Sequence, residues 1–380
     1  MTLASDSPHI GLPSKPGFRT RLMRLIARPG FQRWASAFPL TRRTAAKDGA
    51  ELFDLVQGFV KSQVLFALVE LRVMHRLMDG PLSAEMLAQT CGMRSDRMER
   101  LMMAASAMKL TKRDRTGRYR LARLGAAMVG VPGLDDMIRH HSAFYRDLND
   151  PVALLRDEVD TELSAFWPYV FGAAHATDMD TANRYSDLMA RSQQIVAADT
   201  LSVADLKETR HLLDVGGGYG VFAESAALKH PNLQATVFDL PAVETQAVAL
   251  MQKSKAQDRL RFVPGSFRDD ALPEKADTIS LIRVLYDHED QTVEALLSKV
   301  FDSLPERGSL LISEPMSGGA KPEIAGDVYF SFYCLAMNTG TVRSAARIAE
   351  MCRSAGFYSV KTYPVRRPFV TTTLMAKKSS

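Results

Sequence analysis

Cysteine is scarce in this sequence: its 380 residues include only Cys91, Cys334 and Cys352, which lie far apart. No two of them have the CxxC or CxxxC spacing of a structural zinc site. Such scattered cysteines also exclude a disulfide framework and favour a reducing compartment. His75 and the pair at 140–141 have no partner at ligand spacing either, so we expect no metal site.

Long hydrophobic runs are absent as well. No stretch of about 18 apolar residues occurs, so no membrane-spanning helix is expected, and the first residues lack the apolar segment of a secretion signal. The composition, 46% hydrophobic and 24% charged, is that of a folded globular protein. Because 380 residues exceed the ~250–300 at which a single core stops growing, we expect two domains in a cytoplasmic protein.

Acidic residues are nearly missing from residues 1–47, which hold nine Lys or Arg and only one acidic residue. Within this arm an apolar stripe at helical spacing alternates with basic positions, which predicts a short basic amphipathic helix. The apolar positions are Phe18, Leu22, Leu25 and Ile26, and the basic ones are Arg19, Arg21, Arg24 and Arg28. Two interpretations stay open: the helix lies on an anionic membrane surface, or its stripe packs on a partner subunit.

Residues 51–78 are apolar on every face, which predicts one or two helices buried between subunits. Residues 83–124 follow a helix–turn–helix pattern and end in two strand-like stretches, as in a winged helix. Ser83 is expected to begin the first helix and Ser95 to cap the second. That second helix, SDRMERLMMAASAM, has few side chains able to read base edges, so we expect it to pack against a partner and no nucleic acid to bind.

Residues 134–206 are predicted to be helical and rich in aromatic side chains. The aromatic residues are Phe144, Tyr145, Phe166, Trp167, Tyr169 and Phe171. Such a layer either lines a pocket for an apolar substrate or forms plain core, and core is the commoner outcome.

From residue 211 onward, five short apolar runs alternate with helical stretches. They are HLLDVGGG, QATVFDL, RLRFVPGSF, DTISLIRVLY and SLLISEP. The alternation predicts an α/β fold, with a parallel sheet covered on both faces. The last two runs, YSVKTYPV and FVTTTLMAKK, have no helix between them, so we expect them to pair antiparallel at the edge of the sheet.

The first of these runs ends in a glycine-rich bend, at the point where an α/β sheet binds its ligand. Glycines there let the backbone approach the ligand and adopt positive φ. The dinucleotide motif GxGxxG requires a small third residue, but Val221 stands in that position. The pattern that fits is DxGxGxG, with Asp214, Gly216, Gly218 and Gly220. This variant resembles the loop of S-adenosylmethionine enzymes, so we expect that cofactor.

Two further strand ends support this cofactor. Asp239 ends the second run, where a carboxylate accepts hydrogen bonds from ribose hydroxyls. Ser266 and Phe267 follow the third run, where backbone and a side chain are able to bracket an adenine.

The motifs DVGGGYG, VFDLP, PGSF, RVLYDHED and SEPMSGG occur in this order. With them, residues 50–376 resemble the plant-type, caffeic-acid-like small-molecule O-methyltransferases. The segments RPGFQRWASAFPLTRR, LFDLVQGFV and GDVYFSFYCLAMNTG are closer to the bacterial carotenoid O-methyltransferases that act on hydroxyneurosporene or demethylspheroidene. The resemblance implies a homodimer, formed through the N-terminal domain, that methylates the terminal hydroxyl of a long polyene.

The resemblance also implies a Rossmann-like methyltransferase domain with a seven-stranded sheet. We therefore expect a basic arm at 1–47, a winged-helix-type dimerisation domain at 48–133, a helical linker and substrate-pocket layer at 134–206, and the catalytic domain at 207–380. By position, Gly216 and Asp239 would hold the methionine and ribose parts of the cofactor, and Ser266 with Phe267 would flank its adenine. Arg283 stands near a basic residue of the family that approaches the cofactor.

The catalytic positions depart from the family pattern. Where plant members have a His-Asp pair, this chain has Tyr286-Asp287, with His288 two places on from the expected histidine. We predict in-line displacement, with His288 as the base because a neutral imidazole accepts protons near pH 7. Glu314 matches the glutamate that orients the base. Tyr286 is the alternative at this position, either in the chemistry or in shaping the pocket.

Other functions stay open from the sequence alone. The same fold could methylate a phenolic small molecule or a ring carbon of a bacteriochlorophyll precursor. A winged-helix DNA-binding regulator is the alternative from another class; it would show specific duplex binding with a steep dependence on salt.

Overall fold

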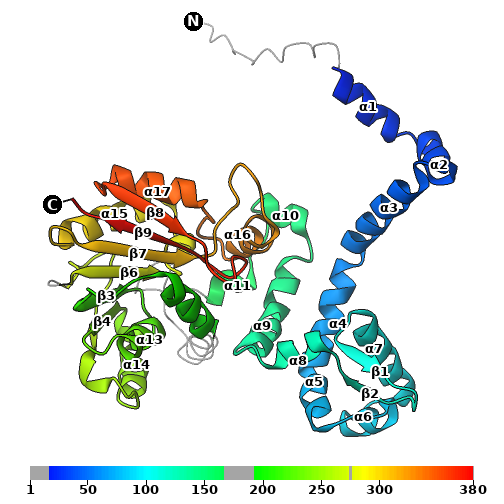
Figure 1. Cartoon of the computed structure of the whole chain (residues 1–380), viewed down its shortest axis with the longest axis horizontal. Helices are drawn as coiled ribbons and strands as arrows, with labels where there is room; N and C mark the ends of the chain where they lie inside the picture. The colour runs from blue at the N-terminus through cyan, green and yellow to red at the C-terminus, as the bar shows by residue number, and fades with distance from the viewer. Residues whose placement is uncertain (1–16, 167–191, 274–275, 380) are drawn as a thin grey trace, which may run out of the picture.

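The computed structural model describes residues 17–166, 192–273 and 276–379. Figure 1 shows two bodies joined by a helical layer, with the first three helices running away from both. The smaller body contains helices and a two-stranded hairpin, whereas the larger one is built on a seven-stranded sheet. The expected α/β fold with a helical N-terminal domain is confirmed.

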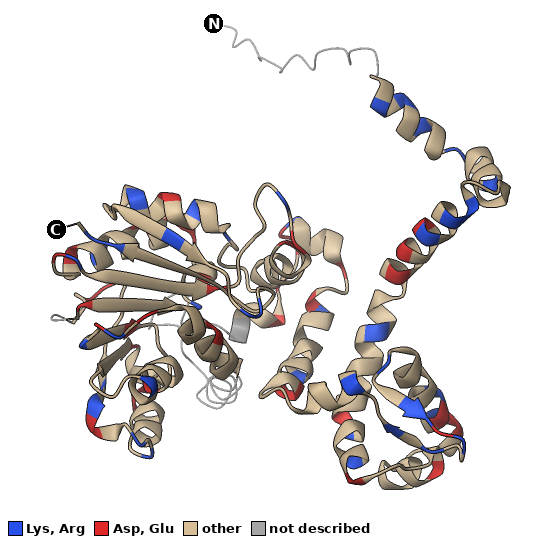
Figure 2. Cartoon of the chain, viewed as in Figure 1, with Lys and Arg blue, Asp and Glu red and all other residues tan. Residues whose placement is uncertain are grey.

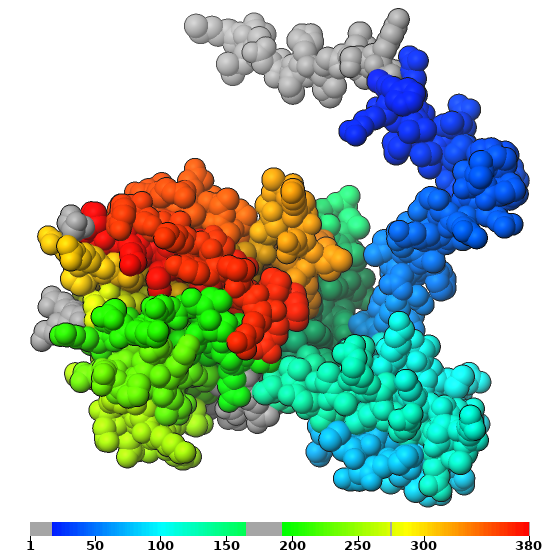
Figure 3. All heavy atoms as spheres, viewed as in Figure 1, coloured from blue at the N-terminus to red at the C-terminus, as the bar shows by residue number. Residues whose placement is uncertain are grey.

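The N-terminal helices are α1 (Phe18–Ile26), α2 (Pro29–Ala37), α3 (Arg42–Val56) and α4 (Gly58–Glu70). α1 is the basic amphipathic helix expected from the sequence, and α1 to α3 stand clear of the two bodies in the space-filling view (Figure 3). Exposed apolar side chains continue from α3 into α4 and include Leu52, Phe53, Leu55, Val56 and Phe59. Within one chain, the expected burial of residues 51–78 therefore begins only at Leu68 and Val69.

α3 crosses the boundary expected at residue 47, so the arm and the next domain share one helix. No single described helix is long and apolar enough to cross a membrane; α3 and α4, which meet at a bend of 50°, pass that test of length and composition only when taken together.

The winged-helix pattern is present in the smaller body. It contains α5 (Val73–Arg76), α6 (Ala84–Thr90), α7 (Ser95–Ala107), β1 (Thr111–Arg113), β2 (Tyr119–Leu121) and α8 (Arg123–Val129). Ser83 caps α6, because its Oγ accepts a hydrogen bond from the Met86 N–H at 3.2 Å. The expectation that Ser95 caps α7 is wrong: Ser95 is already the first helical residue, and the extended Arg94 precedes it without a side-chain cap.

The linking layer contains α9 (Leu134–Asp147), α10 (Pro151–Leu155), α11 (Glu162–Phe166) and a helix over residues 192–203. Phe144 is buried in a cluster that joins α9 and α10 to α16 (Ser331–Ala336), so this aromatic residue belongs to core, as expected. Trp167, Tyr169 and Phe171, which carry the same expectation, lie outside the described residues.

The sheet of the larger body has the strand order β5-β4-β3-β6-β7-β9-β8. Its strands are β3 (His211–Val215), β4 (Gln234–Asp239), β5 (Leu260–Pro264), β6 (Thr278–Ile282), β7 (Ser309–Glu314), β8 (Ser359–Tyr363) and β9 (Thr372–Lys377). The five predicted runs form the parallel strands, and the last two pair antiparallel as expected. β9 lies inside the sheet, between β7 and β8.

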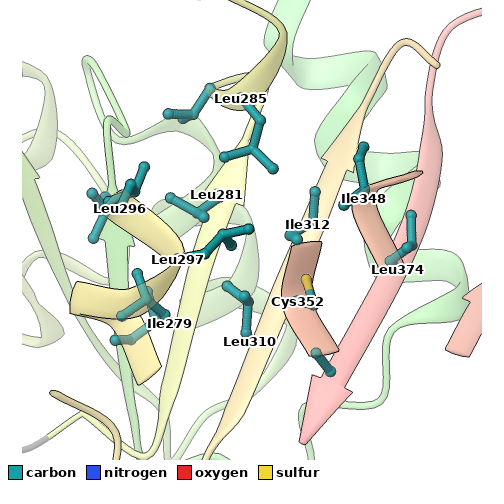
Figure 4. Close-up of a cluster of buried hydrophobic side chains, with 14 of the residues drawn as sticks. Ile279, Leu281, Leu285, Leu296, Leu297, Leu310, Ile312, Ile348, Cys352 and Leu374 are labelled. Atoms are coloured by element: carbon teal, nitrogen blue, oxygen red, sulfur yellow. The ribbon is translucent and has the colours of Figure 1, made fainter. Parts of the chain in front are cut away.

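Helices cover both faces of this sheet (Figure 1). They are α13 (Val221–Lys229), α14 (Glu244–Met251), α15 (Asp290–Ser303) and α17 (Ala345–Ser354). Figure 4 shows Leu296 and Leu297 of α15 and Ile348 and Cys352 of α17 facing the apolar side chains of β6, β7 and β9. A second buried cluster lies under α13 and α14. Because both faces are packed, polar side chains gather at the strand ends, and the strand order reverses between β3 and β6, where such sheets bind ligands.

Candidate functional site

The glycine loop turns sharply between β3 and α13. Gly216, Gly218 and Gly220 have φ values of 68°, 55° and 79°, which residues with a Cβ rarely adopt. The loop is also crowded, since a Cβ on Gly216 would lie 2.9 Å from Cγ2 of Val284. These glycines therefore permit both the turn and the close approach of the β6 end.

Asp214 supports this loop from beneath and is fully buried. Its Oδ1 accepts a hydrogen bond from the Ser280 hydroxyl at 2.6 Å, and its Oδ2 has no hydrogen-bond partner among the described residues. Oδ2 faces the loop, because a Cβ on Gly217 would lie 2.5 Å from it. Burial raises the pKa of the Asp214 carboxyl to about 7.

Asp239 joins the end of β4 to the loop. One carboxylate oxygen accepts the Gly218 N–H at 2.6 Å and the other accepts the Leu240 N–H at 2.7 Å. Each oxygen keeps a further lone pair able to accept a ligand hydroxyl. Asp214, Gly216, Gly218 and Asp239 thus stand together at adjacent strand ends, as the sequence predicts.

Ser266 and Phe267 follow β5, which pairs with β4 next to Asp239. The Ser266 N–H donates to the Asp270 carboxylate at 2.8 Å, and the Ser266 hydroxyl accepts the Arg268 N–H at 3.2 Å. The side chain of Ser266 thus serves the turn itself.

Arg283 follows β6 and has a φ of 60°, a strained conformation for a residue with a side chain. Its guanidinium donates to the Ser192 hydroxyl at 2.9 Å and to the Tyr286 hydroxyl at 3.3 Å. It therefore connects the linking helix to the segment in which the catalytic residues are expected.

That segment, residues 285–288, is held through its backbone. One oxygen of Glu314 accepts the N–H groups of Leu285 and Tyr286 at 2.9 and 3.2 Å. Arg343 donates to the carbonyls of Leu285 and His288 at 2.9 and 2.8 Å. Together these two buried residues fix the turn.

The role expected for Glu314 is therefore corrected: its hydrogen bonds go to the backbone and not to His288, and its other oxygen has no partner among the described residues. Burial raises the pKa of Glu314 to about 8. Burial likewise raises the pKa of Asp287 to about 7, while Arg283 opposes that shift.

The geometry also contradicts His288 as the base. Its Nδ1 lies 3.1 Å from a guanidinium nitrogen of Arg268. Because a guanidinium only donates, Nδ1 accepts and the ring proton is on Nε2. Burial, with the charges of Arg268 and Arg343, lowers the pKa of His288 to about 3, whereas a general base works best with a pKa near the working pH. The ring packs edge-on to Phe267 at 5.2 Å, among the residues expected around the adenine.

Tyr286, at the position of the family histidine, is 1% exposed. Burial raises its pKa well above the usual value, so its hydroxyl keeps its proton near neutral pH. Phe330 contacts the Tyr286 ring edge-on at 6.3 Å. Tyr286 thus packs against the helical turn Ile324–Phe330.

A second polar group, which the sequence predicted to be structural, lies on α9. His140 and His141 of α9 each place Nε2 2.7 Å from a tyrosine hydroxyl, that of Tyr333 and Tyr329 respectively. Burial lowers the pKa of both histidines to about 4. Sequence spacing alone did not indicate these pairs, because their partners lie almost two hundred positions away.

The chain is similar to known proteins over most of its length. A family profile described as an O-methyltransferase domain matches residues 145–358, and one described as an O-methyltransferase dimerisation domain matches residues 53–130. The chain is 46% identical to the demethylspheroidene O-methyltransferase of Cereibacter sphaeroides, over 94% of both chains. It is also 46% identical to the enzyme of that name from Rhodobacter capsulatus, over 96% of this chain and 91% of the relative.

Among solved structures, human N-acetylserotonin methyltransferase in complex with SAM is similar, with a TM-score of 0.75 and 25% identity. The alignment covers 88% of this chain and 98% of that one.

Replacing Asp239 tests the cofactor site. Asp239→Ala removes two acceptors for ribose hydroxyls, each a charged hydrogen bond of about 1.5–3 kcal/mol, so we expect S-adenosylmethionine to bind at least ~100-fold more weakly. Titration calorimetry measures this, with the exposed Asp258→Ala as the matched control. Affinity within threefold of the wild type would show that Asp239 does not hold the cofactor.

The buried ionisable groups predict how stability depends on pH. Asp214, Asp287 and Glu314 have pKa values raised to about 7, 7 and 8 by folding, so the folded state retains protons that the unfolded chain releases. Their contribution is present at low pH and is lost as pH rises through 7 to 8. The histidines with lowered pKa values act oppositely, but only below their unfolded pKa of about 6.5.

We therefore expect the thermal unfolding midpoint of the ligand-free protein to decrease as the pH is raised from 6.5 to 8. Calorimetry at a series of pH values measures this. Glu314→Gln keeps an acceptor for the two N–H groups and should flatten this fall, whereas the exposed Glu306→Gln should not. A midpoint that rises over this range would contradict the raised carboxyl pKa values.

Proposed function

Because this chain belongs to the O-methyltransferase family, we propose that it methylates the terminal hydroxyl of a carotenoid of the hydroxyneurosporene or demethylspheroidene type. The chain is an S-adenosylmethionine-dependent O-methyltransferase. The choice of acceptor rests on the 46% identity of this chain to two demethylspheroidene O-methyltransferases, over nearly its whole length. The identity extends across both the catalytic domain and the N-terminal helices.

The described residues fit the cofactor. The glycine loop leaves no room for a Cβ at Gly216, and each carboxylate oxygen of Asp239 keeps a further lone pair for a ligand hydroxyl. The buried Asp214 supports the loop from beneath. Gly216, Gly218 and Asp239 would hold the methionine and ribose parts, and Phe267 with His288 would flank the adenine. When bound, the cofactor supplies an electrophilic methyl group on a positively charged sulfur.

The protein's own contribution is alignment in a dry site. Holding the acceptor oxygen in line with the methyl group is worth up to ~7–11 kcal/mol of the barrier. The turn at 285–288 is suited to this because Glu314 and Arg343 fix its backbone. An aliphatic hydroxyl is a weak acid, so its proton must leave as the new bond forms, which requires an acceptor within reach.

The helical layer is suited to an apolar acceptor. The partly exposed Tyr145 and Phe330 add aromatic surface around the His141–Tyr329 pair, through edge-on contacts with His141 and Tyr329 respectively. Aromatic walls with a few placed polar groups are typical of sites for apolar ligands. This composition supports a long hydrocarbon with a single hydroxyl at the reacting end.

The match to an O-methyltransferase dimerisation domain supports a homodimer. The second subunit would cover the exposed apolar side chains of α3 and α4. For α1 we propose contact with an anionic membrane, where a carotenoid would be dissolved. Figure 2 shows basic residues along the N-terminal helices. In α1 these flank an apolar stripe whose Phe18 is 82% exposed, the arrangement of an interfacial helix.

A panel of acceptors tests the substrate. We expect purified enzyme with labelled cofactor to label a carotenoid with a terminal hydroxyl, and not phenols or bacteriochlorophyll precursors. Asp239→Ala protein serves as the control for transfer that needs the cofactor site. Label found only in a phenol or a ring carbon would refute the carotenoid assignment while leaving the family assignment intact.

Vesicle flotation tests α1. Each basic residue near an anionic surface contributes about 1 kcal/mol, so replacing Arg19, Arg21 and Arg24 by Gln should weaken binding to phosphatidylglycerol vesicles roughly 100-fold. The control removes three exposed charges from the hairpin region, Lys112, Arg115 and Arg118. Equal loss with both triple variants, or equal binding to neutral vesicles, would argue against a specific role of α1.

A further inference from the structure

We propose that Tyr329 and His141 form the proton relay of methyl transfer, in which the tyrosine oxygen takes the acceptor's hydroxyl proton as its own proton passes to Nε2 of the histidine. The relay would replace the base that this chain lacks at position 286. It rests on the proposed function only in that the acceptor carries a hydroxyl, whether a carotenoid alcohol or a phenol.

The pair has the geometry of a strong hydrogen bond. Nε2 of His141 lies 2.7 Å from the Tyr329 hydroxyl, and the two rings meet edge-on with centroids 5.5 Å apart. α9 supplies the histidine, while the tyrosine belongs to a π-helical turn, Ile324–Phe330. Such turns are rare and occur frequently at functional sites.

The π-helical turn is fixed against the end of β7. The carboxylate of Asp327 accepts hydrogen bonds from the Ser317 hydroxyl at 2.6 Å and from the N–H groups of Gly318 and Glu323 at 2.8 and 2.7 Å. A Cβ on Gly326 would lie 2.1 Å from the Met316 carbonyl oxygen, so only glycine permits this approach. Tyr329 is therefore held by the same strand end that carries Glu314.

Tyr329 also lies next to the groups already described. Its ring contacts Phe330 at 4.9 Å, and Phe330 in turn contacts Tyr286. The charge of Arg283, which donates to the Tyr286 hydroxyl, is close enough to Tyr329 to oppose the rise of its pKa caused by burial. Tyr329 is partly exposed as a residue, whereas its hydroxyl is buried against His141.

The protonation states suit a relay. Burial raises the pKa of Tyr329, so its hydroxyl has a proton to pass on. Burial lowers the pKa of His141 to about 4, so at neutral pH the ring is uncharged and one nitrogen is able to accept. With Tyr329 donating, that acceptor is Nε2 and the ring proton is on Nδ1.

The step balances in atoms and charge. The acceptor oxygen bonds to the methyl carbon as the carbon–sulfur bond breaks, with its electron pair remaining on sulfur. The acceptor's O–H proton moves to the Tyr329 oxygen, and the former Tyr329 proton forms the Nε2–H bond of His141. One positive charge is lost at sulfur and one appears on the imidazolium of His141, so the net charge of the site is unchanged. This balance lets His141 take up the proton although burial lowers its pKa.

The chain offers a matched control one residue away. His140 and Tyr333 make the same bond at 2.7 Å, but Tyr333 is 7% exposed and packs edge-on to the buried Phe144 at 5.3 Å. Tyr333 belongs to the buried cluster that joins α9 to α16, whereas Tyr329 only packs against the outside of that cluster. The His140–Tyr333 pair should support packing and not the reaction.

The experiment compares Tyr329→Phe and His141→Gln with Tyr333→Phe and His140→Gln. General acid–base groups contribute about 10²–10⁴-fold, so we expect the first two variants to lose at least ~100-fold in kcat with KM and calorimetric cofactor affinity nearly unchanged. The double variant should be no slower than either single one, because the pair acts as a unit. The control variants should stay within a few-fold of the wild type.

A second readout does not depend on turnover. In ¹⁵N spectra of the wild type at neutral pH, Nε2 of His141 should show the signal of a hydrogen-bonded acceptor, and Tyr329→Phe, but not Tyr333→Phe, should shift it to that of a free acceptor. A proton found on Nε2 in the wild type overturns the relay, as does Tyr329→Phe with more than a third of wild-type kcat. If the wild type methylates no hydroxyl compound, the proposed function is wrong. The ¹⁵N spectra then still decide whether Nε2 of His141 is the acceptor that the relay requires.

Discussion

The hydrogen bond from the Gly218 N–H to the Asp239 carboxylate, 2.6 Å long, joins the ends of two neighbouring parallel strands and sets the shape of the cofactor site. It requires the positive φ of the glycine loop, which in turn requires that no Cβ meet Val284 from the neighbouring β6 end. Asp214 supports the same loop from below with a buried carboxyl. Three strand ends thus depend on one bend, and so do the cofactor contacts that we propose.

The second constraint is the turn after β6. Glu314 accepts hydrogen bonds from its N–H groups and Arg343 donates to its carbonyls. Both side chains are buried, where an unsatisfied polar group is costly. The glutamate that orients a base elsewhere in the family therefore serves here as a support for the turn. Our proposal therefore places the proton transfer on α9 and the π-helical turn, where His141 and Tyr329 are in contact.

The N-terminal helices have apolar side chains that the rest of the single chain does not cover. Their apolar side chains stay exposed in the single chain, although their sequence pattern is that of buried helices. We propose that the second subunit of the homodimer covers the apolar surface of α3 and α4 and so removes it from water. The shorter, arginine-rich α1 differs in charge, which is why we propose a lipid surface for it.

The sequence by itself determined the order of strands and helices along the chain and the cofactor, because these follow from local periodicity and from glycine and acidic residues at strand ends. It also predicted that Asp214, Gly216, Gly218 and Asp239 lie together at neighbouring strand ends, as they do. It could not determine which side chains act on the acceptor. His288 is near the expected position in sequence, but Arg268 occupies its Nδ1, and Glu314 turns to the backbone. The His141–Tyr329 contact spans 188 positions, so only the packing of α9 against the π-helical turn creates it.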